Sequence, residues 1–123
     1  MGARQDSATV VVVDDEWIIR MTVAGDLADL GYTCHEASDG EEGLALLRAH
    51  PETALLITDL ALPGGLDGRQ VAAAAVAERP GLKVLFITGN DDWAAVLADK
   101  PAVLVKPFTL AQLTAEVERL LCE

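Results

Sequence analysis

The sequence lacks any long apolar run, because none of its hydrophobic stretches reaches the ~20 residues that a membrane-spanning helix requires. The N-terminal stretch MGARQDSA has no apolar segment of the kind that marks a secretory signal. Asp6 also occupies the position where an N-myristoylation motif calls for Ser or Thr. We therefore expect no membrane insertion and a cytoplasmic location.

Cysteine and basic residues are also scarce. The two separated cysteines, Cys34 and Cys122, form no zinc-binding motif, and we expect them to be reduced thiols. Nine Lys and Arg residues stand against twenty Asp and Glu residues, which gives a formal net charge of −11. This charge argues against binding to nucleic acid or to an anionic membrane, and it favours a basic protein partner or a bound cation.

The sequence does contain a regular alternation of strand and helix patterns within 123 residues, the size of one domain. Apolar, β-branched runs without polar alternation predict strands buried on both faces, at residues 9–14, 33–37, 54–59, 83–88 and 102–105. Helices are predicted at residues 16–30, 67–79, 91–98 and 110–121. A further helix is predicted to begin at a capping-box sequence at 38–41 and to end at residue 48. We expect a flexible segment at 1–8 and a folded domain over 9–121.

Five strand-then-helix repeats predict an α/β fold with a doubly wound, five-stranded parallel sheet and helices on both faces. The functional site of such a sheet lies outside the carboxyl ends of its strands. Five polar residues fall at those ends: Asp14, Asp15, Asp59, Thr88 and Lys106. We therefore expect these side chains to converge on one edge of the sheet.

Three carboxylates at one edge repel one another, by about 4 kcal/mol for a pair ~4 Å apart at an effective dielectric of ~20. A bound Mg²⁺ ion and the Lys106 ammonium would balance the charge of Asp14, Asp15 and Asp59. A carboxylate can attack phosphorus and form an acyl phosphate, and the transferring group then needs cations and hydroxyl donors nearby. The pattern favours phosphorylation of Asp59, with Lys106 neutralising charge and Thr88 donating a hydrogen bond.

Each of these residues alone has a simpler interpretation. An acid such as Asp15 after a strand often only caps the next helix, and Lys106 before a proline is often a solvated side chain. Asp59 is harder to explain in this way, because the next helix starts several residues later. The joint spacing of all the residues favours a phosphorylation site. His35 and His50 fall outside this pattern and are assigned no chemistry.

Four motifs carry a family resemblance: VVDDE at 12–16, ITDLALPG…DG at 57–68, LFITG at 85–89 and VKPF at 105–108. Together they resemble the receiver domain of two-component response regulators, and the details look similar to receivers of hybrid histidine kinases and to stand-alone receivers. The resemblance implies a (βα)5 flavodoxin-like, or CheY-like, fold and a role in a phosphorelay. A histidine kinase or histidine phosphotransfer protein would pass a phosphoryl group to Asp59, and the domain would then change conformation to control an output protein.

The resemblance also implies a metal site. Asp15 would ligate Mg²⁺, or Mn²⁺ as an alternative, directly, and Asp14 would do so largely through water. Asp59 itself and the backbone carbonyl of Ala61 would supply further ligands. The domain would catalyse only its own phosphorylation and slow dephosphorylation, so we expect no enzyme activity on a separate substrate.

Contacts to the phosphoryl group are implied in the same way. The side chains of Thr88 and Lys106 would contact its oxygens after transfer, and Thr88 would be the moving switch residue. The backbone N–H groups of Leu60 and Gly89 would donate hydrogen bonds to it.

Three departures from the family pattern bear on the output. Val103 stands where members usually carry Tyr or Phe, and the loop at 63–68 is one residue longer than the common version. The stretch from Thr88 to Lys106 is about four residues shorter than usual, roughly one helical turn. We therefore predict that signalling relies on backbone movement of residues 88–98, around Trp93, in place of an aromatic side-chain rotation.

Two other functions stay open from the sequence. One is a Mg²⁺-dependent phosphohydrolase with an aspartyl-phosphate intermediate, although such enzymes carry a second acid where this chain has Ala61. The other is a docking module that needs no phosphate, which the loss of Asp15, Asp59 or Lys106 would have favoured. The sequence ends at residue 123, just past the last predicted helix, so we expect no attached effector domain.

Overall fold

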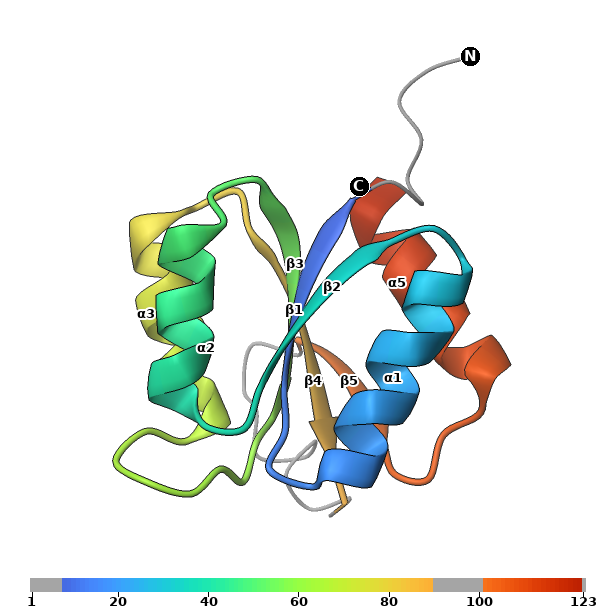
Figure 1. The fold of residues 1–123 in the computed structure, drawn as a ribbon, viewed down its shortest axis with the longest axis horizontal. Coiled ribbons are helices and arrows are strands. Elements are labelled where there is room, and N and C mark those ends of the chain that lie inside the picture. Colours follow the sequence, from blue (N-terminus) through green and yellow to red (C-terminus); the bar gives the residue numbers. More distant parts are fainter. Residues whose placement is uncertain (1–7, 90–100, 123) are drawn as a thin grey trace.

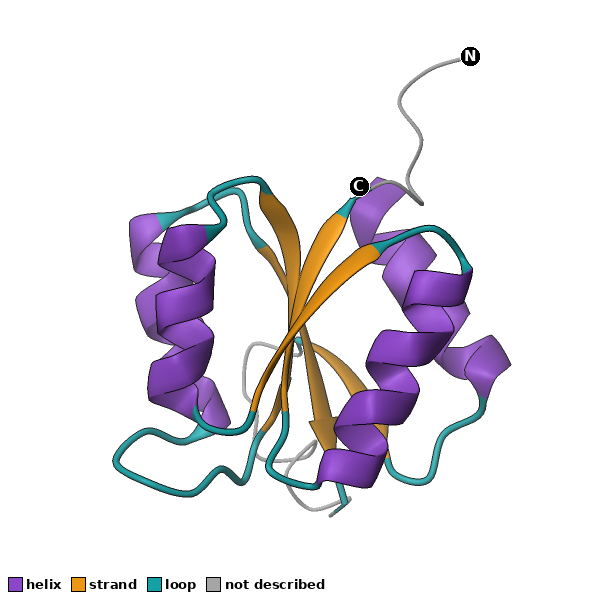
Figure 2. Cartoon of the chain, viewed as in Figure 1, coloured by secondary structure: helices purple, strands orange, loops and turns teal. Residues whose placement is uncertain are grey.

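The computed structural model describes residues 8–89 and 101–122. Five strands form one parallel sheet in the order β2-β1-β3-β4-β5, and helices lie on both of its faces (Figure 2). This architecture confirms the doubly wound α/β fold. In chain order the described elements are β1 (Thr9–Val13), α1 (Trp17–Asp29), β2 (Thr33–Ala37), α2 (Gly40–Ala49), β3 (Thr53–Asp59), α3 (Gly68–Glu78), β4 (Lys83–Thr88), β5 (Ala102–Val105) and α5 (Leu110–Cys122).

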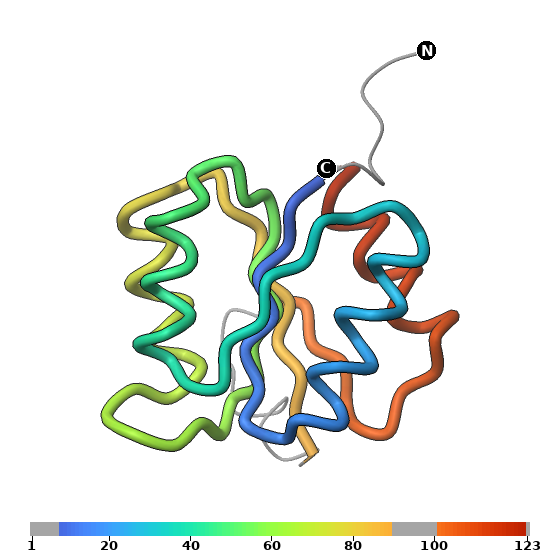
Figure 3. Tube along the Cα trace, in the orientation of Figure 1, coloured from blue at the N-terminus to red at the C-terminus, as the bar shows by residue number. Residues whose placement is uncertain are grey.

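Two separate sets of apolar side chains pack on the two faces of the sheet. Figure 1 shows α1 and α5 on one face and α2 and α3 on the other, and Figure 3 shows the strands running between these two layers. Along β1, Val10 and Val12 pack toward α1 and α5, whereas Val11 and Val13 pack toward α2 and α3, and all four are fully buried. Burial on both faces explains why the strand sequences are apolar without alternation.

The N-terminus of α2 differs by one residue from the expected capping box at 38–41. Asp39 is the N-cap, and its side chain accepts the Glu42 N–H at 2.8 Å. The Glu42 carboxylate in turn accepts the Ser38 N–H at 2.8 Å. Ser and Asp cap helices about equally well, so the spacing alone did not decide between the two residues.

The helix predicted over 91–98, with Trp93, lies outside the described residues, as do residues 1–7. The predicted backbone movement of residues 88–98 therefore stays a prediction. None of the helices that the structure describes is long and apolar enough to cross a membrane.

Candidate functional site

Acidic side chains gather at the carboxyl ends of the strands. Asp14 directly follows β1, and Asp59 is the last residue of β3, the strand beside it. Oxygens of Asp14, Asp15 and Asp59 lie within 4.8 Å of one another. Asp14 is fully buried and Asp59 is 5% exposed, whereas Asp15 lies at the surface. We call these three residues the acidic cluster.

The Lys106 ammonium lies inside this group of acids. Its Nζ donates to Asp59 Oδ2 at 2.9 Å and to Glu16 Oε1 at 2.6 Å, and it lies 3.0 Å from Asp14 Oδ2. Burial lowers the pKa of Lys106, but the carboxylates of Glu16, Asp59 and Asp14 raise it by more, so the pKa lies above its ordinary value. Lys106 is therefore a permanent positive charge next to Asp59.

Asp14 has unsatisfied capacity for a cation. Its Oδ1 accepts the Glu16 N–H at 2.8 Å. Its buried Oδ2 forms an ion pair with Lys106 Nζ at 3.0 Å and has no hydrogen bond of regular geometry from the described residues. Burial raises the pKa of Asp14 and the Asp59 charge adds to this, against the Glu16 N–H and Lys106, which lower it. A buried carboxylate oxygen whose only close polar contact among the described residues is one ion pair fits a hard divalent cation.

The backbone around Asp59 differs from the predicted arrangement of donors. The Leu60 N–H, predicted to face a phosphoryl group, donates instead to the Ile87 carbonyl of β4 at 3.1 Å. This hydrogen bond continues the pairing of β3 with β4 beyond Asp59, so the Leu60 N–H points into the sheet. The N–H that faces the Asp59 carboxylate belongs to Ala61, which donates to Oδ1 at 3.1 Å. The Leu60 N–H is thus used within the sheet, and its predicted contact to a phosphoryl group stays a prediction.

Gly68, the first residue of α3, packs directly on the backbone of Asp59. A Cβ atom added to Gly68 would lie 2.0 Å from the Asp59 carbonyl oxygen, which is far inside van der Waals contact. The Gly68 N–H donates to the Leu60 carbonyl at 2.9 Å. Close approach of two backbones requires glycine, and here it holds α3 against the end of β3.

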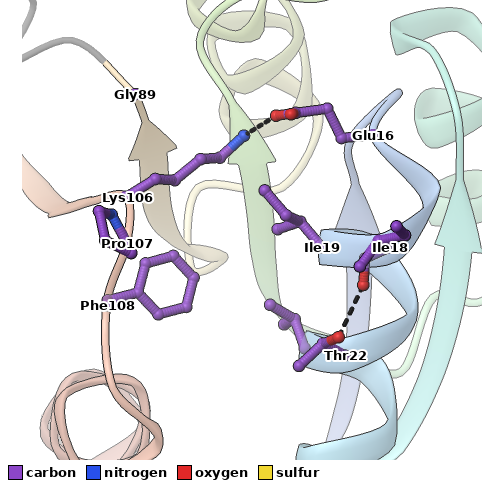
Figure 4. Close-up of a pocket in the computed structure, with 9 residues that line it drawn as sticks. Glu16, Ile18, Ile19, Thr22, Gly89, Lys106, Pro107 and Phe108 are labelled. Carbon is purple, nitrogen blue, oxygen red and sulfur yellow. Dashed lines mark hydrogen bonds and ion pairs between the residues drawn. The ribbon is translucent and has the colours of Figure 1, made fainter.

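Thr88 and Gly89 lie at the same edge, on the β4 side of Asp59. Thr88 ends β4 and is 2% exposed, and its backbone carbonyl accepts the Lys106 N–H at 2.7 Å. Gly89 is exposed and lines a groove together with Lys106 (Figure 4). The structure thus brings both residues to the edge that holds Lys106, and their contacts to a phosphoryl group stay predictions.

The groove beside Lys106 is largely apolar. Ile19 of α1 lies on one side and Phe108, which precedes α5, on the other (Figure 4). Val23 of α1 also lines the groove. Ile18, which also lines the groove, is 63% exposed, and Trp17, which precedes it on α1, is 58% exposed. Exposed apolar side chains grouped in this way are typical of a surface that contacts another protein.

Two residues at the site were missed by the sequence analysis. Glu16 forms the shortest contact to Lys106, and Arg20 donates from Nη1 to the Asp14 carbonyl at 2.9 Å and forms an ion pair with Glu36. Glu16 belongs to the VVDDE motif, but its partner lies 90 residues away in the chain. No local spacing indicates such a pair.

Comparisons with known proteins show the family of the chain. The response regulator receiver domain profile matches residues 10–118. The sensor kinase CckA of Brucella abortus (strain 2308) is 36% identical over 120 residues, which are 94% of this chain and 13% of that protein. The response regulator receiver protein CpdR of the same strain is 33% identical over 119 residues, covering 91% of this chain and 95% of that protein.

A solved structure, the response regulator receiver protein from Sinorhizobium medicae WSM419, superimposes with a TM-score of 0.84 at 29% identity. The match covers 97% of this chain and 98% of that one. The family profile also spans nearly all of the sequence between β1 and α5. The chain therefore belongs to the receiver domain family of two-component response regulators.

Proposed function

We propose that this receiver domain accepts a phosphoryl group on Asp59. The observation that carries the proposal is the Lys106 ammonium, which lies 2.9 Å from Asp59 Oδ2 and beside two further acids at the carboxyl edge of the sheet. A positive charge in this place can stabilise the negative charge that develops on a transferring phosphoryl group. The nucleophile for this transfer is the Asp59 carboxylate, which ends β3 at the site and is 5% exposed.

The reaction is the attack of an Asp59 carboxylate oxygen on the phosphorus of a phosphohistidine. The P–N bond breaks, its electron pair stays on the histidine nitrogen, and a P–O bond forms as the aspartyl phosphate. Lys106 then pairs with the phosphoryl oxygens, and the Ala61 N–H, which already donates to Asp59 Oδ1, lies beside the same carboxylate. The Thr88 hydroxyl and the Gly89 N–H are the proposed further donors.

The acidic cluster fits Mg²⁺, with Mn²⁺ as an alternative. Asp14, Asp15 and Asp59 carry three negative charges, and among the described residues of the cluster the one positive charge beside them is that of Lys106. These carboxylates and the Ala61 carbonyl would hold the ion, which when bound would offset negative charge on the phosphoryl oxygens.

The phosphodonor is proposed to be a histidine kinase or a histidine phosphotransfer protein. Ile18 lines the groove beside Lys106, and Trp17 and Met21 are exposed on the same helix, α1. These exposed apolar side chains support docking of a protein there. One relative is itself named a sensor kinase and another a receiver protein. We propose a cytoplasmic location and an output through a protein, without binding to nucleic acid.

We further propose that the domain is no enzyme toward separate substrates and loses its phosphoryl group slowly. Both histidines of the chain lie away from the acidic cluster, and Ala61 occupies the position where a phosphohydrolase would carry a second acid. The site therefore has no evident general base among its described residues to activate water. This favours the receiver function over the phosphohydrolase.

The test is the intact mass of the protein after incubation with acetyl phosphate and Mg²⁺. The wild type should gain one phosphoryl group that hydroxylamine removes, because an acyl phosphate is labile to that nucleophile. Asp59→Asn should gain none, whereas Asp29→Asn, which changes an exposed acid at the end of α1, should be labelled like the wild type. Labelling of Asp59→Asn to the wild-type level would refute the assignment.

A further inference from the structure

A second group of candidate ligands lies where the end of α2 meets β2. His35 belongs to β2, His50 is the C-cap that directly follows α2, and Glu52 lies in the turn before β3. One ligand atom from each lies within 4.8 Å of the others. The two imidazole rings stack, with their centroids 3.7 Å apart and their planes inclined by 12°. His50 Nδ1 lies 3.5 Å from Glu52 Oε2. We call these three residues the histidine corner.

The histidine corner contains every histidine of the chain. The sequence has two histidines, on different elements and 15 residues apart, and the fold places their rings face to face. His35 pairs with Val11 of β1, whose side chain packs toward α2 and α3, so His35 lies on the same face of the sheet as α2. The pair is therefore a product of the tertiary structure, separate from the motifs of the acidic cluster.

The backbones that carry these side chains are held in place. His35 lies in the ladder between β1 and β2. The His50 carbonyl accepts both the backbone N–H and the hydroxyl of Thr53, at 3.0 and 2.7 Å. The Arg79 guanidinium donates to the carbonyls on either side of Glu52. All three side chains can therefore turn toward a ligand from fixed backbone positions.

The donor atoms of the histidine corner suit a different ion from those of the acidic cluster. Imidazole nitrogens and one carboxylate favour divalent transition metals such as Zn²⁺, whereas Mg²⁺ prefers oxygen ligands alone. The Cys34 thiol, next to His35 in sequence, packs on the opposite face with the α1 and α5 residues. Burial, with a smaller effect of the Glu36 carboxylate, raises the pKa of Cys34 to about 11, so it stays protonated at neutral pH.

We propose that the histidine corner binds one divalent transition-metal ion of the Zn²⁺ class, through one nitrogen of each histidine and one Glu52 oxygen. Three protein ligands and water complete a four-coordinate shell. A ring nitrogen binds metal in the plane of its own ring, so two nearly parallel rings must turn out of their stack to bind one ion. Binding thus exchanges the ring stack for coordination and joins the end of α2 to the edge strand β2. The phosphorylation of Asp59 has no part in this inference.

The experiment is a ZnCl₂ titration of the full chain, in the Cys122→Ser background and in excess Mg²⁺, followed by NMR of the imidazole nitrogens. Since the chain has two histidines, every imidazole signal comes from this corner. We expect both histidines to shift together, to saturate at one Zn²⁺ per chain, and to lose the ring-current shifts that stacked rings impose on each other.

Variants then identify the ligands. His35→Gln and Glu52→Gln should each weaken Zn²⁺ binding by at least about tenfold, because each removes a direct ligand. Glu41→Gln, which removes an exposed charge from the first turn of α2, should leave the affinity unchanged and is the matched control. Asp15→Asn should also leave it unchanged, because that residue belongs to the acidic cluster.

Three results would each overturn the proposal: imidazole signals that do not move with Zn²⁺, an affinity equal in His35→Gln and the wild type, or an affinity that falls with Asp15→Asn alone. A thermal unfolding curve of His35→Gln shows whether the variant is folded, and so separates loss of the His35 imidazole as a metal ligand from loss of the fold. Should that variant unfold, Glu52→Gln decides the question, because the Glu52 side chain is 57% exposed and its removal leaves the core intact.

Discussion

The acidic cluster and the histidine corner each bring three candidate ligands together, but they are prepared for binding to different degrees. In the acidic cluster, Asp14 and Asp59 are buried, and Lys106 already supplies a positive charge. In the histidine corner, the side chains are partly or largely exposed, and the two rings contact each other. The acidic cluster can therefore receive a charged ligand with little movement, whereas the histidine corner must first rearrange its side chains.

The largest effect is expected from Gly68→Ala, which tests whether the acidic cluster stands on a rigid backbone. The added Cβ would meet the Asp59 carbonyl oxygen at 2.0 Å, so β3 and α3 must separate. We expect the free energy of unfolding to fall by about 3 kcal/mol, measured by urea denaturation. In Gly25→Ala the new Cβ meets nothing within 4 Å, and we expect a gain of about 0.5–1 kcal/mol from helix propensity.

Equal stability of the Gly68→Ala and Gly25→Ala variants would show that the end of β3 yields easily, and the contrast with the histidine corner would be lost. The imidazole NMR signals are a second control. They should be unchanged in Gly68→Ala as long as the protein is folded.

A smaller effect is expected from Asp15→Ala, which tests whether the two groups select different ions. Removal of a charged oxygen ligand should weaken Mg²⁺ binding by at least about tenfold. Trp17, two residues away and exposed, should report the titration by its fluorescence. In Glu52→Gln the Mg²⁺ affinity should stay at the wild-type value. A Mg²⁺ affinity that is lower in Glu52→Gln than in Asp15→Ala would reverse the assignment of ions.

The smallest effect is expected from Glu16→Gln. The Glu16 carboxylate contacts the Lys106 ammonium at 2.6 Å and so competes with Asp59 for it. Because exposed ion pairs contribute about 0.2–1 kcal/mol, we expect labelling by acetyl phosphate to become about two- to fivefold faster. Glu42→Gln, at the start of α2, should label at the wild-type rate. Slower labelling of Glu16→Gln would mean that Glu16 positions Lys106 for the reaction.

The acidic cluster was predictable from the sequence because it depends on topology. When strands alternate with helices, parallel pairing places the residues at the carboxyl ends of β1, β3 and β5 at one edge of the sheet. This placement does not depend on their side-chain contacts. Asp14, Asp59 and Lys106 therefore came together as expected. The two covered faces follow from the same pattern, whereas the strand order was implied only by the resemblance to a flavodoxin-like fold.

The features that the sequence did not predict depend on individual hydrogen bonds and side-chain contacts. The Leu60 N–H donates to the Ile87 carbonyl because the hydrogen bonding of β3 with β4 continues one residue beyond Asp59. The ring stack of His35 and His50 requires the end of a helix to meet the edge of a sheet, which no residue spacing encodes. The Glu16 contact to Lys106 likewise joins residues that are far apart in the chain.

The backbone of Leu60 has a practical consequence for measuring movement. Its N–H is bound to β4 and its carbonyl to Gly68, so β3, β4 and the start of α3 are tied together at one residue. A probe attached to the first turn of α3 is therefore a fixed origin for spectroscopic distances. Distances would be measured from this probe to a second probe placed on α1 or after β5. A change in distance on phosphorylation would then be assigned to movement of the second probe.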